Sequence, residues 1–380
     1  MKKTLAFVLS LVLLAAIGFG GCGAAPDTSP AQPAAPAAQE PAQTPDGDAS
    51  ADQPAGRVAV VLGVGGLGDQ GFNDLVYAGA LRAQQELGVE FDYAEPTQIA
   101  DFEIIIRDLA SSGSYDLIVN VGFNQIDPLI RIASEFPDQI FALIDGVVDA
   151  PNVISYISRE EEGSFLVGAL AGLMNLNAEH YGLNVENTIG FVGAMENPLI
   201  VKFGAGFAAG ARFVNPDIQV LADFVGGASP FSDPTTAQEI AIAQNTRGAN
   251  IVYHAAGGSG IGVFQAAAER DFFAIGVNQN QNMIEPDHII ASMLKRVDTA
   301  TFNAIQATVV DGNPPAGSTI VLGLAEEGVG FTLEFSNIQI DASDVAIVNS
   351  LRDQIIAGAL VVPETFAEVD AFLAANQFQG

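Results

Sequence analysis

The chain has 380 residues and a formal net charge of −31 at pH 7, from 45 acidic residues against 14 lysines and arginines. Hydrophobic residues make up 49% of it, enough for a sizeable core, and the length favours about two domains. A surface this acidic repels phosphate backbones, so we expect no binding to nucleic acid.

Residues 1–21 have the pattern of an export signal. Lys2 and Lys3 precede the apolar run TLAFVLSLVLLAAIGFG, which is short for a membrane span. Cys22, the only cysteine, follows directly and has no partner for an internal disulfide. The arrangement resembles the lipid-acceptor site of bacterial lipoproteins, which implies lipidation of Cys22 and a lipid anchor on the extracytoplasmic face of the cell membrane. The alternative is an ordinary secretory signal followed by an incidental cysteine.

The segment after Cys22 has the composition of a tether. Residues 23–56 contain no aromatic residue, no lysine and no arginine, and are rich in alanine and proline. Such a segment cannot bury enough apolar surface to offset its ordering entropy. The sequence therefore predicts a disordered tether over residues 22–56, with the folded part beginning at Arg57.

From Arg57 onward, short apolar runs alternate with amphipathic helical patterns. Strands are expected within residues 58–64, 116–122, 140–146, 153–158, 188–194, 220–227, 249–257 and 272–278. Helices are expected over residues 74–87, 102–111, 127–135, 161–174, 200–214, 235–246, 262–270 and 299–310. This alternation predicts an α/β fold with two doubly wound parallel sheets, whose ligands bind beyond the carboxyl ends of the strands.

The first predicted strand leads into a glycine-rich loop with G-x-G-x-x-G at Gly63, Gly65 and Gly68. A dinucleotide-binding loop needs its helix to begin inside the motif, whereas the helical pattern here begins later, near Asn73. We therefore favour a different role, in which Phe72 stacks on a ring-shaped ligand and Asn73 caps the helix. The alternative is that Phe72 only plugs the base of the loop.

Several segments resemble the basic membrane protein (BMP) family of substrate-binding lipoproteins of ABC transporters, whose best understood members are purine nucleoside receptors. They are GDQGFND, YDLIVNVGF, FPDQIFALIDGVVDAPNVISYISREEEGSFLVGALAG, IGFVGAMENPLIVKFGAGFAAGA, FSDP, HAAGGSGIGVFQAA and SMLKRVD. The resemblance implies a type I periplasmic-binding-protein fold, with two lobes joined by a multi-strand hinge that close on a ligand. Lobe 1 is expected over 57–156 plus about 287–325, and lobe 2 over about 157–286 plus 326–380.

The resemblance also implies residue roles. Phe72 and Phe231 would sandwich a planar base, Asn73 and Asp127 would hydrogen-bond its edge, and Lys295 would lie near the sugar. The implied ligand-binding set is Asp69, Phe72, Asn73, Phe123, Asp127, Asp145, Phe231, Asp233, Ala256, Gly257, Asn278, Asn280 and Lys295.

One stretch departs from the family pattern, which usually reads G-V-D-S-D-Q. This chain has Asn278 and Asn280 in place of the two aspartates. An amide both donates to and accepts from a hydroxyl, but without the strength of a charged carboxylate. The change weakens the hydrogen bonds expected to the sugar hydroxyls and removes a possible anionic partner of Lys295.

No arrangement of residues indicates catalysis, a metal site or a cofactor. Ser259 lacks the spacing of a nucleophile elbow, and the three histidines have no ligand spacing. His254 is more typical of a packed side chain than of a pocket residue. Glu160–Glu162 read as an acidic helix N-terminus rather than as metal ligands.

Together these features predict a monomeric lipoprotein that binds a nucleoside in an interlobe cleft and delivers it to an ABC permease without chemistry. A receptor for a sugar or another heterocycle is the alternative within this class. An exported nucleoside hydrolase would need an activated water, for which the sequence offers no cluster. A cytoplasmic regulator with a sensor fold is disfavoured by the signal sequence and by the lack of a basic DNA-reading module.

Overall fold

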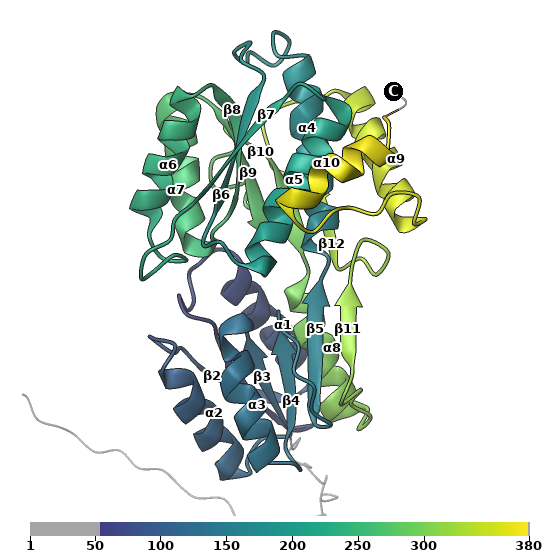
Figure 1. The fold of residues 1–380 in the computed structure, drawn as a ribbon. Helices are drawn as coiled ribbons and strands as arrows, with labels where there is room; N and C mark the ends of the chain where they lie inside the picture. The colour runs from purple at the N-terminus through teal and green to yellow at the C-terminus, as the bar shows by residue number, and fades with distance from the viewer. Residues whose placement is uncertain (1–53, 379–380) are drawn as a thin grey trace, which may run out of the picture. The chain divides into compact units, whose positions relative to one another are not determined.

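The computed structural model describes residues 54–378, which form two α/β lobes, each built around a six-stranded sheet (Figure 1). The predicted signal peptide, Cys22 and most of the predicted tether lie outside these residues. The fold begins slightly before the expected Arg57. The Ala55 N–H donates to the Gly88 carbonyl at 3.0 Å, and the Gly56 carbonyl accepts from the Glu90 N–H at 2.9 Å. The end of the predicted tether is therefore part of the folded lobe.

Lobe 1 contains a sheet in which every adjacent pair of strands is parallel. Its spatial order is β11 (Thr319–Leu322), β5 (Val153–Ser158), β4 (Ile140–Ile144), β3 (Leu117–Val121), β1 (Arg57–Val61) and β2 (Glu90–Ala94). Val58 of β1 lies opposite Leu117 on one side and Phe91 on the other. The central strands are almost wholly buried, which explains their continuous apolar runs.

Helices cover both faces of this sheet. They are α1 (Phe72–Leu87), α2 (Asp101–Ser112), α3 (Ile126–Glu135) and α8 (Val297–Ile305), which continues as the π-helical η3 (Gln306–Val310). Val58 and Val60 of β1 pack in one core with α1 and α8, whereas Ala59 and Val61 pack in another with α2 and α3. The alternation along β1 places the two helix pairs on opposite faces.

Lobe 2 has a sheet that is parallel except for one pair. Its order is β12 (Val329–Thr332), β10 (Ile289–Lys295), β9 (Phe273–Asn278), β8 (Ala249–Ala255), β6 (Thr188–Gly193) and β7 (Gln219–Phe224). β10 and β12 are antiparallel. The expectation of a wholly parallel second sheet is wrong at this edge, because the chain returns into the lobe from the opposite direction.

The helices of lobe 2 also form two layers. They are α4 (Glu160–Leu176), α5 (Pro198–Val214), α6 (Pro234–Thr246), α7 (Ile261–Arg270), α9 (Ala342–Ile356) and α10 (Phe366–Ala375). Gly168 of α4 and Gly210 of α5 each face the partner helix's backbone where a Cβ atom would clash, so glycine allows the two helices to approach closely. Within residues 54–378, no helix combines the length and apolar character of a membrane span.

Within the described residues, three segments connect the lobes: β5 to α4 at 158–160, β10 to α8 at 295–297, and β11 to β12 at 322–329. Lobe 1 was expected to resume near residue 287, and this boundary between the lobes is wrong. β10 pairs with β9 from Ile289 onward and belongs to lobe 2, so the chain crosses to lobe 1 only after Lys295.

Candidate functional site

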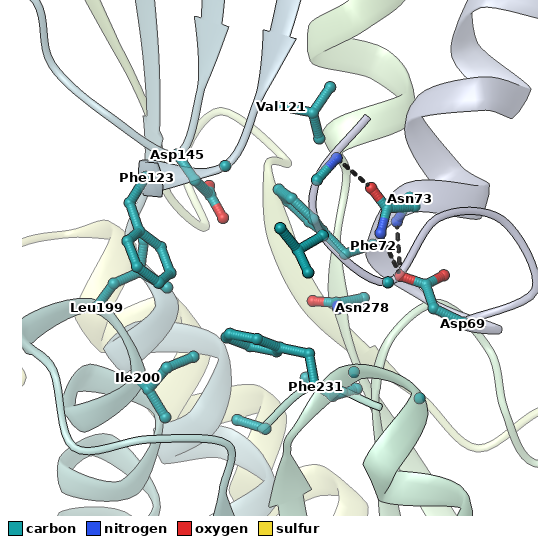
Figure 2. Close-up of a pocket in the computed structure, with 18 of the residues that line it drawn as sticks. Asp69, Phe72, Asn73, Val121, Phe123, Asp145, Leu199, Ile200, Phe231 and Asn278 are labelled. Atoms are coloured by element: carbon teal, nitrogen blue, oxygen red, sulfur yellow. Dashed lines mark hydrogen bonds between the residues drawn. The ribbon is translucent and has the colours of Figure 1, made fainter. Parts of the chain in front are cut away.

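A cavity lies between the lobes, beside the carboxyl ends of strands from both sheets (Figure 2). Its lobe 1 wall consists of Gly63, Val64, Gly65, Asp69, Phe72, Asn73, Val121, Gly122, Phe123, Asn124 and Asp145. Its lobe 2 wall consists of Leu199, Ile200, Phe203, Phe231, Ala255, Gly257, Gly258, Val277, Asn278 and Lys295. This position agrees with the rule that ligands of open α/β sheets bind beyond the strand ends.

The glycine-rich loop between β1 and α1 is folded around Asp69. The Asp69 carboxylate accepts the Gly71 N–H at 2.9 Å and the Asn73 N–H at 2.8 Å. The expectation that Asn73 caps α1 is wrong, because α1 begins at Phe72 and Asp69 satisfies the first N–H groups of the helix. The Asn73 Oδ1 instead accepts the Gly63 N–H at 2.8 Å, and its Nδ2 donates to Asp69 at 3.2 Å.

The conformation of this loop depends on two glycines and on the buried carboxylate of Asp69. Gly65 and Gly68 have φ values of 115° and 88°, a backbone region that favours glycine. Burial raises the pKa of Asp69, although its backbone hydrogen bonds act in the opposite direction. The result is a turn held by hydrogen bonds to Asp69, and it presents Phe72 at the start of α1.

Four aromatic rings line the cavity, those of Phe72, Phe123, Phe203 and Phe231. Figure 2 shows the side chains of Phe72 and Phe231 on opposite sides of it, from lobe 1 and lobe 2. Phe123 lies in the turn η1 (Phe123–Gln125), and its ring centroid is 6.3 Å from that of Phe231 at an interplanar angle of 54°. The Phe123–Phe231 contact therefore joins the two lobes at the side of the cavity.

Ser259 holds the loop that carries Phe231. It lies in the turn η2 (Gly257–Gly260), and its hydroxyl accepts the Asp233 N–H at 2.7 Å and donates to the Pro230 carbonyl at 2.9 Å. The Ser259 N–H also donates to the Phe231 carbonyl at 3.2 Å. These bonds flank Phe231 on both sides and give the buried Ser259 a structural role.

A buried ion cluster lies beside the cavity at the lobe crossovers. The Nζ of Lys295 is 2.5 Å from Oδ2 of Asp145 and 2.8 Å from Oε1 of Glu160. Burial alone would lower the pKa of Lys295, but the two carboxylates outweigh it and raise this pKa, so the lysine is charged. Asn278 and Asn280, which replace the family's two aspartates, therefore do not leave Lys295 without an anionic partner. The other oxygen of Asp145, Oδ1, is buried without a hydrogen-bond partner among the described residues.

Four of the predicted site residues do not line the cavity. Asp127 is exposed in the first turn of α3. Asp233 caps α6 by accepting the Thr236 N–H at 3.0 Å. The Asn280 side chain points away, donating to the Glu334 carbonyl at 3.2 Å. Ala256 is buried behind its neighbours, and Ala255 and Gly257 form the wall in its place.

The other nine predicted residues meet at the cavity, together with several that the sequence did not reveal. Asn124 follows Phe123 in the polar stretch after a predicted strand. The pattern that indicated Phe123 as a site residue would therefore have indicated Asn124 as well. Phe203 and Leu199 lie in the apolar α5 and gave no signal of a pocket. In the sequence, Glu160 indicates only the acidic first turn of a helix. Its contact with Lys295 becomes visible only in the folded structure.

The histidines and acidic residues do not form a metal centre in the part of the chain that the structure describes. His254 is fully buried, with its ring 5.0 Å from that of Phe264 in a T-shaped contact. Burial lowers the pKa of His254 to about 4, so the ring is neutral at physiological pH. The interpretation of His254 as a packed side chain is confirmed.

Known proteins are similar to this chain in sequence and in fold. The family model described as "ABC transporter substrate-binding protein PnrA-like" matches residues 57–365. An uncharacterized lipoprotein of Pyrococcus abyssi is 36% identical over 287 residues, covering 72% of this chain and 68% of the relative. The ABC transporter nucleoside-binding protein BmpA of Lactococcus lactis is 28% identical over 329 residues, covering 81% of this chain and 89% of the relative.

The crystal structure of an ABC transporter solute-binding protein from Aeropyrum pernix K1 is similar with a TM-score of 0.75 and 32% identity. The match covers 84% of this chain and 98% of that chain. The sequence resemblance and the two-lobed periplasmic-binding-protein fold are thereby confirmed. The chain belongs to the family of PnrA-like substrate-binding proteins of ABC transporters.

Proposed function

We propose that this protein is a receptor that captures a nucleoside, with a purine as the base, and delivers it to an ABC permease. The observation that carries the proposal is the placement of Phe72 and Phe231 on opposite lobes around one cavity. A flat base between these rings gains stacking contacts with both lobes, which favours closure. The name of the Lactococcus lactis relative, a nucleoside-binding protein, supports the same ligand class.

The polar groups of the cavity suit the rest of a nucleoside. Asp145 lines the cavity and has one buried oxygen without a partner, which would accept a ligand O–H or N–H. Asn278 is nearly buried in the wall and offers both a donor and an acceptor. Lys295 is neutralised by its two carboxylates, so the cavity offers no unpaired cation for a phosphate. These features favour a neutral, hydroxyl-rich ligand over a nucleotide.

The proposed receptor binds and releases its ligand unchanged. It acts as a monomer, tethered by a lipidated Cys22, and its partners are the nucleoside, the membrane and the permease. Replacement of Cys22 by serine should release the protein from membranes in fractionation. Recovery of the unmodified protein wholly in the soluble extracytoplasmic fraction would contradict the anchor.

Mass spectrometry of small molecules released by denaturing the purified protein tests the ligand class. The proposal predicts that a purine nucleoside is released in a near-stoichiometric amount. Recovery of a sugar or another heterocycle instead would overturn it. Incubation with added nucleosides, followed by chromatography, distinguishes a receptor from a hydrolase, since only a hydrolase yields free base.

A further inference from the structure

Gln281 makes a hydrogen bond between the lobes, outside the cavity wall. It follows β9 in lobe 2 and is nearly fully buried. Its Nε2 donates to the Gln70 carbonyl of lobe 1 at 2.8 Å. Gln70 belongs to the glycine-rich loop that presents Phe72, so this bond ties the binding loop of one lobe to the sheet of the other.

The orientation of the Gln281 amide is fixed by its other partners. Its Oε1 accepts the Val277 N–H at 2.7 Å, and Val277 lines the cavity. The Nε2 of His254 lies 3.1 Å from the same oxygen. A flipped amide would set its NH2 group against the Val277 N–H and its oxygen against the Gln70 carbonyl. Only the orientation that donates across the lobes satisfies these groups.

His254 also contributes to the orientation of the Gln281 amide. Because Gln281 Oε1 is an acceptor, the neutral His254 must carry its proton on Nε2 and donate. Its other nitrogen, Nδ1, is buried with no hydrogen-bond partner in the described structure and packs against Gly260. Burial lowers the pKa of His254 to about 4, which keeps the ring neutral and the bond direction constant near neutral pH.

The acceptor is also held in an unusual backbone conformation. Gln70 has a φ of 48°, in the left-handed region that non-glycine residues rarely adopt. The N–H group of Gln70 itself donates to the Asp74 carboxylate at 3.0 Å, which helps to fix this turn. A carbonyl fixed in this way is a preformed acceptor for the opposite lobe.

We propose that Gln281 is a positioning residue that stabilises the lobe arrangement seen here, in which the cavity is enclosed, by linking Val277 in the cavity wall to the binding loop at Gln70. It does not touch the ligand in this role. The inference rests on the proposed function only in placing the ligand in this cavity, and it holds for any ligand enclosed there. Loss of the bond should weaken binding mainly by accelerating release.

The sharpest test is Gln281→Glu. A carboxylate still accepts from Val277 and His254, but it cannot donate to the Gln70 carbonyl and places a charged oxygen against it. Gln279→Glu is the control for the added charge, because it introduces the same charge two residues away, at a partly exposed side chain. Gln281→Ala removes all of the side-chain bonds and shows whether the effect depends on the new charge.

The lobe separation can be followed by spin labels on the full chain. Labels at Ile99→Cys in lobe 1 and Ser229→Cys in lobe 2 occupy exposed positions, in a Cys22→Ser background that removes the native thiol. Pulsed electron resonance then reports the distance distribution with and without inosine as the probe. Thermal melting and inosine dissociation rates are measured on the same variants.

We expect Gln281→Glu to shift the distribution toward longer distances and to weaken inosine binding about tenfold or more, which corresponds to 1.4 kcal/mol or more. Most of this loss should appear in the dissociation rate, and Gln279→Glu should match the wild type. Distances and affinity equal to the wild type in Gln281→Glu would overturn the proposal, as would a loss of thermal stability alone. If inosine does not bind the wild type, the nucleoside proposal fails, whereas the ligand-free distance distributions still test Gln281.

Discussion

The ammonium group of Lys295 lies 2.5 Å from the carboxylate of Asp145, although the two residues are separated by 150 positions in the sequence. Lys295 ends β10 in lobe 2, Asp145 follows β4 in lobe 1, and Glu160 joins them from the start of α4. All three charges are buried, so each depends on the others to offset its loss of hydration. The cluster thus fixes both lobes beside the cavity.

Lys295→Met should therefore destabilise the protein strongly, because it leaves two buried carboxylates without a cation. We expect a loss of about 3–5 kcal/mol in the free energy of unfolding at pH 7, measured by urea denaturation. Arg270→Met is the control, since its pair with Glu269 is about half exposed and should contribute less than about 1 kcal/mol. Equal losses in the two variants would show that the cluster does not stabilise the fold.

Phe72→Ala should weaken binding of inosine and spare the fold. Base–aromatic stacking contributes roughly 1–3 kcal/mol per base in nucleic-acid binders, or about five- to 150-fold in dissociation constant. Phe72→Tyr keeps the ring and should cost less. Phe102→Ala, at a fully buried ring in the core of lobe 1, should show the opposite pattern, with about 3–5 kcal/mol of lost stability and native affinity. If Phe72→Ala behaves like Phe102→Ala, Phe72 is a core residue.

Asn278→Asp tests the contact with sugar hydroxyls. A carboxylate accepts hydroxyl hydrogen bonds with about twice the strength of a neutral amide, so inosine should bind several-fold more tightly. The backbone φ of 70° at residue 278 suits aspartate as well as asparagine. Titration with 2′,3′-dideoxyinosine provides the control, because this compound lacks the vicinal hydroxyls and should gain nothing. The same gain for both compounds would place Asn278 elsewhere than at the sugar.

Glu161 should make stability depend on pH. Burial raises its pKa to about 7, and Lys202 at 3.8 Å offsets this only in part. The folded state therefore binds a proton more readily than the unfolded state, so the stability that Glu161 contributes is full below pH 4.5 and is lost as the pH rises through 7.

Glu161→Gln mimics the protonated side chain and isolates this effect. The variant should match the wild type near pH 4.5 and exceed it by up to about 3 kcal/mol at pH 8, as measured by denaturation at several pH values. Subtracting the two curves removes contributions from His254 and other titrating groups. A difference that stays constant across this range would contradict the raised pKa.

Local sequence patterns predicted most helices well. α3 and α7 begin within one residue of expectation and end where expected, because amphipathic periodicity and helix-end residues are local features. β2 was missed because its sequence, EFDYA, lies at a half-exposed edge and lacks an apolar run. The interior strand β10, the short edge strands β11 and β12 and the C-terminal helices α9 and α10 were missed as well.

Features that depend on contacts between distant parts of the sequence could not be predicted from local patterns. The lobe to which β10 belongs depends on its pairing with β9, and no local signal encodes that choice. Likewise, the partners of Lys295 come from distant segments that meet only after folding. Nine of the thirteen predicted site residues still converged on the cavity, because strand ends of an α/β sheet gather at one edge.

Isothermal titration of the dialysed protein with inosine, guanosine and adenosine tests the central claim most directly, with ribose and hypoxanthine as comparators. A nucleoside unites the stacking base and the hydroxyl-bearing sugar, so at least one of the three should bind more tightly than either fragment, by about tenfold or more. Failure of all three nucleosides to bind, or binding of ribose as tight as that of the best nucleoside, would contradict the account.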